Sequence, residues 1–82
     1  MDKIKNALND YVIISKVNCI YCDMVEELLK DAFIDYTVIK IETLTEDELK
    51  AIKPEEAKKY PFVFKSNKYI GGYNELKKEL NN

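Results

Sequence analysis

The stretch that decides the fold is YVIISKVNCIYC, residues 11–22. Its first part, Tyr11–Ser15, is a β-branched and aromatic run, the pattern of a strand buried on both faces. Two cysteines, Cys19 and Cys22, follow after a short connection. Beyond them, apolar residues recur at intervals of three and four and predict an amphipathic helix of about three turns ending near Phe33. These apolar residues are Val25, Leu28, Leu29, Ala32 and Phe33. The sequence therefore predicts a strand that enters a helix through a Cys-x-x-Cys loop.

The middle of the chain predicts a second strand and a second helix. Tyr36–Ile41 has the composition of a strand. Thr45 and Glu48 fit a capping box, in which the Thr hydroxyl accepts the backbone N–H three residues on and the Glu side chain reaches back. A helix should therefore begin there. Pro54 ends it or opens a further turn through Ala57.

The last third of the chain predicts a hairpin and a helix. Pro61–Phe64 reads as a third strand, and Lys65–Lys68 is a tight connection to the short strand that follows. Gly71–Gly72 stops that strand, because glycine weakens a strand and favours a turn. Tyr73 or Asn74 then begins a helix.

The order of these elements is βαβαββα, which indicates an α/β fold with a small four-stranded mixed sheet. Right-handed crossovers make the first two strands parallel and place helices on both faces of the sheet. Asp2 also fits the cap of a short helix that carries Ile4, Ala7 and Leu8 before the first strand. No repeat or linker composition divides the chain, so we expect one domain over residues 1–82.

Charge and hydropathy argue against several classes of partner. The 82 residues carry 13 basic and 15 acidic side chains mixed along the chain, for a net charge of −2, which gives no field to attract nucleic acid. The longest apolar runs are far shorter than the roughly 20 residues that span a bilayer. The segment Met1–Lys5 lacks the apolar core of a secretory signal. We therefore expect no nucleic-acid or membrane partner and a cytoplasmic location.

The chain has two cysteines and no histidine. A bridge between Cys19 and Cys22 closes a very short loop, and it therefore removes little entropy from the unfolded chain and suits a redox switch better than a structural staple. One chain offers the pair no further thiol or imidazole for a structural zinc site. We accordingly expect redox chemistry at this pair and no bound metal.

The predicted helix gives the two thiols different roles. Cys19 falls at the helix N-terminus, where unpaired N–H groups and the helix dipole favour an anion. A thiolate is such an anion, so we expect the Cys19 pKa to fall below its ordinary value of about 8.5, with Lys16 as a further cation nearby. Cys22 lies one turn deeper. It is positioned to attack a mixed disulfide formed at Cys19 and to close the intramolecular bridge.

With these residues in place, the chain resembles the glutaredoxin family of the thioredoxin-like fold over nearly all of its length, from Tyr11 to Leu80. The strand that precedes Cys19-Ile20-Tyr21-Cys22 is similar to the family's first strand and active-site loop. Tyr60-Pro61 stands where the thioredoxin fold has a cis-proline, and Gly71-Gly72-Tyr73-Asn74-Glu75-Leu76 resembles the segment that binds glutathione. The chain differs from the common pattern at Ile20, where the family usually has proline.

The resemblance implies a set of site residues. Cys19 and Cys22 are the implied catalytic residues. The lysines Lys58 and Lys59 are expected on a solvated face, with the wall of the cleft as the alternative for Lys59. A cis Tyr60–Pro61 bond would offer the backbone of Tyr60 to a peptide, as an added strand. Glycines that allow close backbone approach, and N–H groups at a helix start, suit a carboxylate. The implied glutathione-binding residues are Lys16, Tyr21, Tyr60, Pro61, Gly72, Tyr73 and Asn74.

The implied activity is that of an enzyme, a glutathione-dependent thiol–disulfide oxidoreductase. It would reduce protein disulfides or glutathione mixed disulfides as a monomer, with glutathione as the reductant and ribonucleotide reductase among the candidate substrates. Two alternatives stay open. The loss of the active-site proline motivates a dimer that holds a [2Fe–2S] cluster with glutathione. A thioredoxin-like electron donor reduced by a flavoprotein is the other.

Overall fold

The computed structural model describes residues 10–55, 57 and 59–81, and the short helix predicted after Asp2 lies outside them. Its four-stranded sheet has the order β2-β1-β3-β4. β1 is parallel to β2 and antiparallel to β3, and β3 is antiparallel to β4. The strands are β1 (Tyr11–Ser15), β2 (Tyr36–Lys40), β3 (Phe62–Lys65) and β4 (Lys68–Gly71). The α/β class, the mixed sheet and the element order are therefore confirmed for the described residues.

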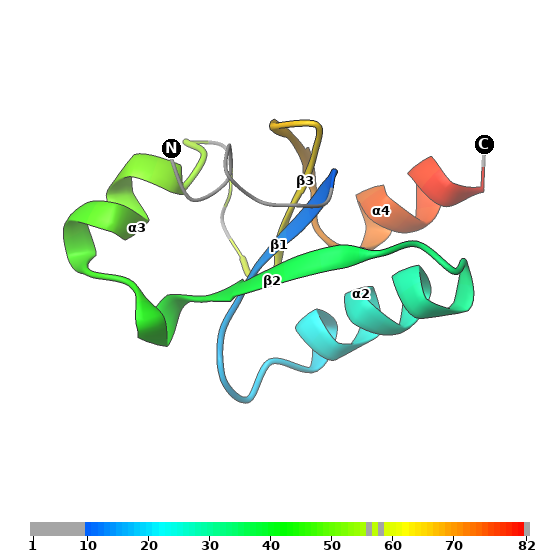
Figure 1. Ribbon diagram of the computed structural model, residues 1–82, viewed down its shortest axis with the longest axis horizontal. Coiled ribbons are helices and arrows are strands. Elements are labelled where there is room, and N and C mark those ends of the chain that lie inside the picture. Colours follow the sequence, from blue (N-terminus) through cyan, green and yellow to red (C-terminus); the bar gives the residue numbers. More distant parts are fainter. Residues whose placement is uncertain (1–9, 56, 58, 82) are drawn as a thin grey trace.

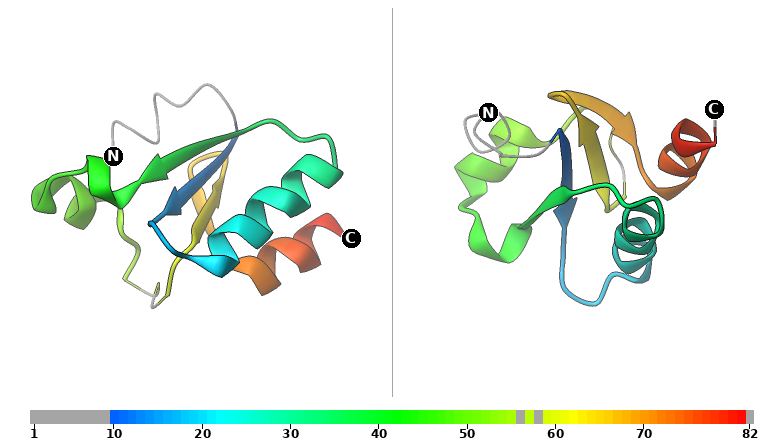
Figure 2. Two further views of the ribbon diagram at one scale, coloured as in Figure 1. Left: turned by 90° about the horizontal axis from the view of Figure 1, so that it is seen from below. Right: turned by 45° about the vertical axis from the view of Figure 1, so that its right-hand side comes forward.

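Helices cover both faces of the sheet (Figures 1 and 2). α2 and α4 lie side by side on one face, and α3 lies on the other. The helices are α2 (Ile20–Asp31), α3 (Glu46–Ile52) and α4 (Tyr73–Leu80), with a short 3-10 helix η1 (Ile41–Thr43) after β2. No helix in the described residues is long and apolar enough to cross a membrane.

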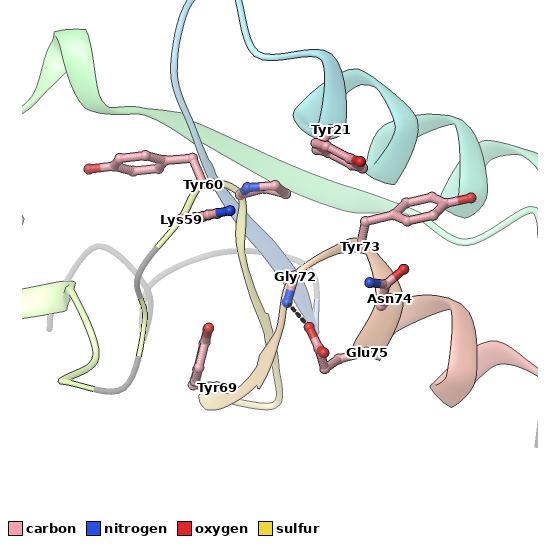
Figure 3. Close-up of a pocket in the computed structure, with 9 residues that line it drawn as sticks. Tyr21, Lys59, Tyr60, Tyr69, Gly72, Tyr73, Asn74 and Glu75 are labelled. Carbon is pink, nitrogen blue, oxygen red and sulfur yellow. Dashed lines mark hydrogen bonds between the residues drawn. The ribbon is translucent and has the colours of Figure 1, made fainter.

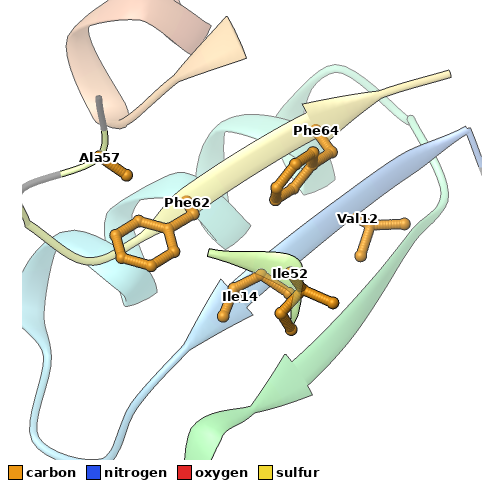
Figure 4. Packing of buried hydrophobic residues seen from close by; sticks show 6 residues of the cluster. All are labelled: Val12, Ile14, Ile52, Ala57, Phe62 and Phe64. Atoms are coloured by element: carbon orange, nitrogen blue, oxygen red, sulfur yellow. The ribbon is translucent and has the colours of Figure 1, made fainter. Parts of the chain in front are cut away.

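Side chains on the two faces of β1 belong to two separate hydrophobic clusters, because successive side chains on a strand point to opposite faces. Val12 and Ile14 pack with Phe62, Phe64 and Ile52 on the α3 side (Figure 4). The alternate residues of β1 pack on the α2 and α4 side. That second cluster is Tyr11, Ile13, Val25, Leu29, Val63 and Leu76. Burial of all five β1 residues confirms the prediction of a strand covered on both faces.

α2 ends earlier than its apolar pattern predicts. Phe33, expected on the inner face, lies outside the helix with its side chain 95% exposed and its backbone in the left-handed region at φ +58°. The Phe33 N–H donates to the Lys30 carbonyl at 3.0 Å, and the Ile34 N–H donates to the Leu29 carbonyl at 2.9 Å. These two bonds form a Schellman motif, which turns the chain out of the helix. The prediction for Phe33 was wrong because this local termination overrides the helical periodicity.

The segment after β2 is fixed by local hydrogen bonds. β2 ends at Lys40, one residue earlier than predicted, because Ile41 begins η1. The Leu44 N–H closes that turn on the Ile41 carbonyl at 3.0 Å. The capping box predicted at Thr45 is present: its hydroxyl accepts the Glu48 N–H at 3.1 Å, and its own N–H donates to Glu48 at 2.9 Å. α3 therefore starts where the sequence predicts.

Proline and turn residues set the remaining boundaries. α3 ends at Ile52, because Lys53 takes an extended conformation before Pro54, as proline requires of the residue that precedes it. The hairpin between β3 and β4 turns on Ser66 and Asn67, both at positive φ (50° and 68°). The predicted hairpin is confirmed, with strands that extend further than expected into the turn region: Lys65 and Lys68, predicted in the connection, pair with each other, and Gly71 is the last residue of β4. α4 begins at Tyr73, directly after the glycine pair.

Candidate active site

The two cysteines occupy the first turn of α2. Cys19 is the residue that caps the helix, and its Sγ accepts the Cys22 N–H at 3.1 Å. Cys22 is 1% exposed, whereas Cys19 is partly exposed. The two sulfurs are joined as a disulfide, with the Cα atoms 5.2 Å apart. Because the outer sulfur already takes a helix N–H, a thiolate at Cys19 would receive the same donor and the positive end of the helix dipole.

An apolar rim, defined here as Val17, Ile20 and Tyr21, surrounds the outer cysteine. Their side chains are 57%, 75% and 57% exposed. Only Phe33 joins them as an exposed large hydrophobic residue in the described part of the chain. Ile20, which stands where the family usually has proline, therefore points to solvent and takes no part in the core.

A proline borders the cysteines from the neighbouring strand. The Tyr60–Pro61 peptide bond is cis, as the sequence analysis expects, and Pro61 is buried. β3 begins at the next residue, and Ile14 near the end of β1 pairs with Phe62. The start of β3 and the end of β1 therefore meet at one edge of the sheet. This register brings Pro61 to the edge from which the active-site loop leaves β1.

A cleft of about 440 Å³ opens between α2, the segment before β3 and the start of α4 (Figure 3). Tyr21 and Tyr73 lie on the same side of it, with their rings tilted at 51° and their centres 6.0 Å apart. Its lining residues are Tyr21, Lys59, Tyr60, Pro61, Tyr69, Gly72, Tyr73, Asn74 and Glu75. All the glutathione-binding residues named from the sequence line this cleft except Lys16, and Lys59, for which the cleft was the alternative to a solvated face, lines it as well.

Of the two glycines before α4, Gly71 is the one whose backbone and packing require glycine. Gly71 has φ +128°, and a Cβ there would lie 2.6 Å from the Glu75 Cβ. Gly71 does not line the cleft, so its conformation and the packing of Glu75 explain it without a ligand. Gly72 does line the cleft, and an added Cβ would meet the Pro61 carbonyl oxygen at an ordinary 3.5 Å.

The Glu75 side chain caps the N-terminus of α4. Its Oε1 accepts the Gly72 N–H at 2.7 Å, as the dashed line in Figure 3 marks. The Glu75 carboxylate thus satisfies one of the backbone donors that a helix leaves unpaired at its N-terminus. The glutathione-like segment predicted from the sequence includes Glu75, and the structure adds its bond to the Gly72 N–H and its place in the cleft lining. Because glycine has no side chain to accept an N–H, only the reciprocal half of a capping box, a Glu three residues after the N-cap, marks this bond in the sequence.

Lys16 lies at the edge of the cleft rather than in its lining. Its Nζ sits 5.5 Å from the centre of the Tyr60 ring, a cation–π contact. Burial first, and then the negative charge of Glu42, raise the pKa of the Tyr60 phenol. Tyr60 also stacks on Phe62, with ring centres 4.3 Å apart. Lys16 therefore joins the site through Tyr60.

Tyr69 is a further lining residue that the sequence analysis did not name. It comes from β4 and contacts Phe62 and Phe64 at ring-centre distances of 6.5 and 5.6 Å. Only the pairing of β3 with β4 brings it beneath the cleft, so no local sequence signal marks it. Among the described residues, no group of three or more acidic, cysteine or histidine side chains could hold a metal ion.

A thioredoxin-like fold with a redox-active dithiol capping a helix, beside a cis-proline, defines the class of thiol–disulfide oxidoreductases. Within that class, the glutaredoxin family model matches residues 11–70, and the chain belongs to the glutaredoxin family. No curated protein sequence matches. Family and fold together support thiol–disulfide oxidoreductase activity.

Several solved glutaredoxins resemble the chain. A buckwheat glutaredoxin in complex with glutathione is 26% identical, with 89% of this chain and 69% of that chain covered and a TM-score of 0.76. The dithiolic glutaredoxin 2-C-Grx1 of Trypanosoma brucei brucei is 28% identical, with 98% and 84% covered and a TM-score of 0.77. The holo form of glutaredoxin C1 from Populus tremula x tremuloides is 26% identical, with 89% and 68% covered and a TM-score of 0.73.

Proposed function

We propose that the protein is a glutathione-dependent oxidoreductase that reduces protein disulfides and glutathione mixed disulfides. The observation that carries the proposal is the cleft beside the Cys19–Cys22 pair, which gathers Tyr60, Pro61 and Gly72 from separate segments. The buckwheat glutaredoxin of similar fold binds glutathione, which supports the same ligand here.

The first step uses Cys19 as the nucleophile. The Cys19 thiolate attacks one sulfur of the substrate disulfide, forms a mixed disulfide and expels the other sulfur as a thiolate, which takes a proton from water. Its place as the cap of α2 supports this role, because the Cys22 N–H stabilises negative charge on the outer sulfur. Burial of Cys22 supports the assignment, since a substrate reaches the partly exposed sulfur first.

The second step uses Cys22 as the resolving thiol. Cys22 loses its proton and attacks the Cys19 sulfur, which releases the second substrate thiol and leaves the intramolecular disulfide. One glutathione thiolate then opens this bridge by attack on Cys19, and a second removes the first as glutathione disulfide. The protein returns to its dithiol form, and two electrons have passed from two glutathiones to the substrate disulfide.

The lining of the cleft suits glutathione in three ways. The backbone of Tyr60, next to the cis bond, can pair with the cysteinyl unit of glutathione as an added strand. N–H groups of Tyr73 and Asn74 at the start of α4 suit a carboxylate. Tyr21 can cover the sulfur, and Lys16 next to Tyr60 offers a cation to the other carboxylate.

We further propose that the protein acts as a monomer in the cytoplasm. Its two cysteines form one short bridge and leave no set of structural disulfides, which fits a compartment where glutathione keeps thiols reduced.

A coupled turnover assay tests the donor. Reduction of a mixed disulfide between glutathione and a small thiol is followed with glutathione and glutathione reductase, and in parallel with the flavoprotein thioredoxin reductase alone. The proposal predicts sustained turnover with glutathione and little with the flavoprotein alone. Turnover supported by the flavoprotein alone would overturn it. Lys16→Ala should raise the KM for glutathione, because it removes the cation offered to the second carboxylate, and Lys30→Ala, in the last turn of α2, is the matched control.

A further inference from the structure

Glu42 links the segment after β2 to the active-site loop. β1 and β2 are parallel, and their last residues, Ser15 and Lys40, are paired. Chain segments that leave the carboxyl ends of neighbouring parallel strands emerge at the same edge of the sheet. The loop that leads to Cys19 and the η1 turn therefore lie next to each other, although they are far apart in the sequence.

A hydrogen bond joins these two segments. The Val17 N–H donates to Glu42 Oε2 at 3.1 Å across 25 positions of sequence. Its acceptor is a carboxylate, and hydrogen bonds to charged groups are about twice as strong as neutral ones. The bond meets the chain two residues before Cys19, in a turn where Asn18 has φ +58°. It therefore restrains the turn that delivers the nucleophile to the start of α2.

The segment that carries Glu42 is itself held firmly. Thr43 Oγ1 donates to the Lys40 carbonyl at 2.7 Å, and the Leu44 N–H donates to the Ile41 carbonyl at 3.0 Å. Ile41 and Leu44 pack against the hydrophobic cluster on the α3 face. Glu42 thus projects from a turn that is anchored on both sides, so its carboxylate can act as a fixed point for the loop.

The charge of the same carboxylate also influences Tyr60, on the segment before β3. It acts on the phenol of Tyr60, the residue before cis Pro61, and the Lys16 ammonium lies over the ring of that tyrosine. The hydrogen bond to the Val17 N–H is thus the direct contact of Glu42 with the active-site loop, and its charge acts on Tyr60 from a distance.

We propose that Glu42 is a positioning residue that, through its bond to the Val17 N–H, holds the loop before Cys19 in the geometry for thiol–disulfide exchange. This inference rests on the proposed role of Cys19 as nucleophile. Small displacements of a reacting group lower rates strongly, because exchange needs the attacking sulfur aligned with the disulfide.

The test compares Glu42→Ala, which removes the acceptor, with Glu42→Gln, which keeps an oxygen acceptor and removes the charge. Glu27→Ala, on the exposed face of α2, is the control for loss of a surface carboxylate. We expect Glu42→Ala to lower kcat/KM by about tenfold. Glu42→Gln and Glu27→Ala should stay within about twofold of the wild type, and thermal unfolding shows whether each variant is folded.

Two readouts separate positioning from simple structural damage. The Val17 amide should exchange its hydrogen faster in Glu42→Ala than in Glu42→Gln, measured by NMR without any turnover. The single-turnover rate of the first exchange step should fall in Glu42→Ala alone, measured with the reduced protein and a stoichiometric disulfide. Equal rates in Glu42→Ala and the wild type would overturn the proposal, and so would a Glu42→Gln variant as slow as Glu42→Ala. Failure of the proposed function would instead appear as a wild-type protein without glutathione-dependent turnover.

Discussion

The two ends of α2 both depart from ordinary helix capping, and in different ways. At the N-terminal end, Cys19 takes the place usually held by Ser, Thr, Asp or Asn, and its sulfur accepts the Cys22 N–H. At the C-terminal end, Phe33 takes the left-handed position usually held by glycine, with its ring almost fully exposed. A cysteine cap replaces an oxygen acceptor with a nucleophile. Phe33 stands where glycine would adopt the left-handed conformation without strain, and it provides no reactive group.

The residues around each end of α2 show how the unusual capping residue found there is to be interpreted. Cys19 has a buried thiol partner one turn away and a cis-proline across the edge of the sheet. Phe33 has a shallow surface lined by Lys30, Ile34 and Tyr36. We therefore assign the cysteine cap to thiol–disulfide exchange and the left-handed Phe33 to a loss of folding stability.

Cys19→Ser should separate activity from folding stability, and it has the largest expected effect. The serine hydroxyl keeps the acceptor for the Cys22 N–H, so the unfolding free energy of the reduced protein should change little. The nucleophile is lost, and activity should fall by about a thousandfold or more. Coupled turnover and urea unfolding of the reduced proteins measure the two quantities. A variant with full activity would show that the nucleophile lies elsewhere.

Leu29→Ala tests the other end of the helix through its packing. Leu29 is fully buried between α2 and the sheet, so its truncation should cost about 3 kcal/mol of unfolding free energy. The kcat of the folded protein should remain within about twofold of the wild type, because the cysteines lie at the opposite end. Chemical denaturation followed by circular dichroism gives the free energy. Leu28→Ala, at a partly buried position on the same helix, should cost less.

Tyr36→Phe removes a hydrogen bond near the C-terminal end of α2. The Tyr36 hydroxyl donates to Glu26 Oε1 at 3.1 Å, so the change should cost about 1 kcal/mol at pH 8. Burial first, and then the hydrogen bond and charge of Glu26, raise the pKa of the Tyr36 phenol. The folded state therefore holds this proton more tightly than the unfolded chain does.

The sign of the pH dependence follows from that shift. The Tyr36 contribution is fully present below the ordinary tyrosine pKa of about 10 and is lost as the pH rises through the higher folded-state pKa. Urea unfolding of both proteins between pH 8 and pH 11 should therefore show the difference between wild type and Tyr36→Phe shrinking. A difference that grows with pH would contradict the assignment.

Phe33→Gly has the smallest expected effect and the opposite sign. Glycine adopts the left-handed conformation without the clash of a Cβ, so the unfolding free energy should rise by about 0.5–1 kcal/mol. Phe33→Ala keeps that clash and serves as the control, with no gain expected. Thermal and urea unfolding measure both. A gain in Phe33→Ala equal to that in Phe33→Gly would assign the effect to the exposed ring rather than to the backbone.

Much of the fold could be predicted because its signals are local. The β-branched run at Tyr11–Ser15, the capping box at Thr45 and the proline at position 54 each fix a boundary through neighbours in the sequence. The prediction that Phe33 lies on the inner face of α2 failed because a Schellman motif, formed by backbone hydrogen bonds, ends the helix before the apolar repeat ends.

The site could be predicted only as far as its motifs reach. The cysteines, cis Pro61 and Gly72 carry recognisable patterns, and the structure brings them to one cleft edge. Tyr69 and Glu42 carry none, because both reach the site through strand pairing. The bond from Glu42 to the Val17 N–H depends on the parallel register of β1 and β2, which composition does not give.

The roles of Cys19 as nucleophile and Cys22 as resolving thiol are tested by single-cysteine variants, which act on a glutathionylated peptide with glutathione as the reductant. Cys22→Ser keeps the exposed nucleophile and needs no resolving thiol for this substrate, so it should transfer glutathione at a rate near that of the wild type. Cys19→Ser, which keeps only the buried thiol, should be inactive. Activity in Cys19→Ser together with none in Cys22→Ser would contradict the account.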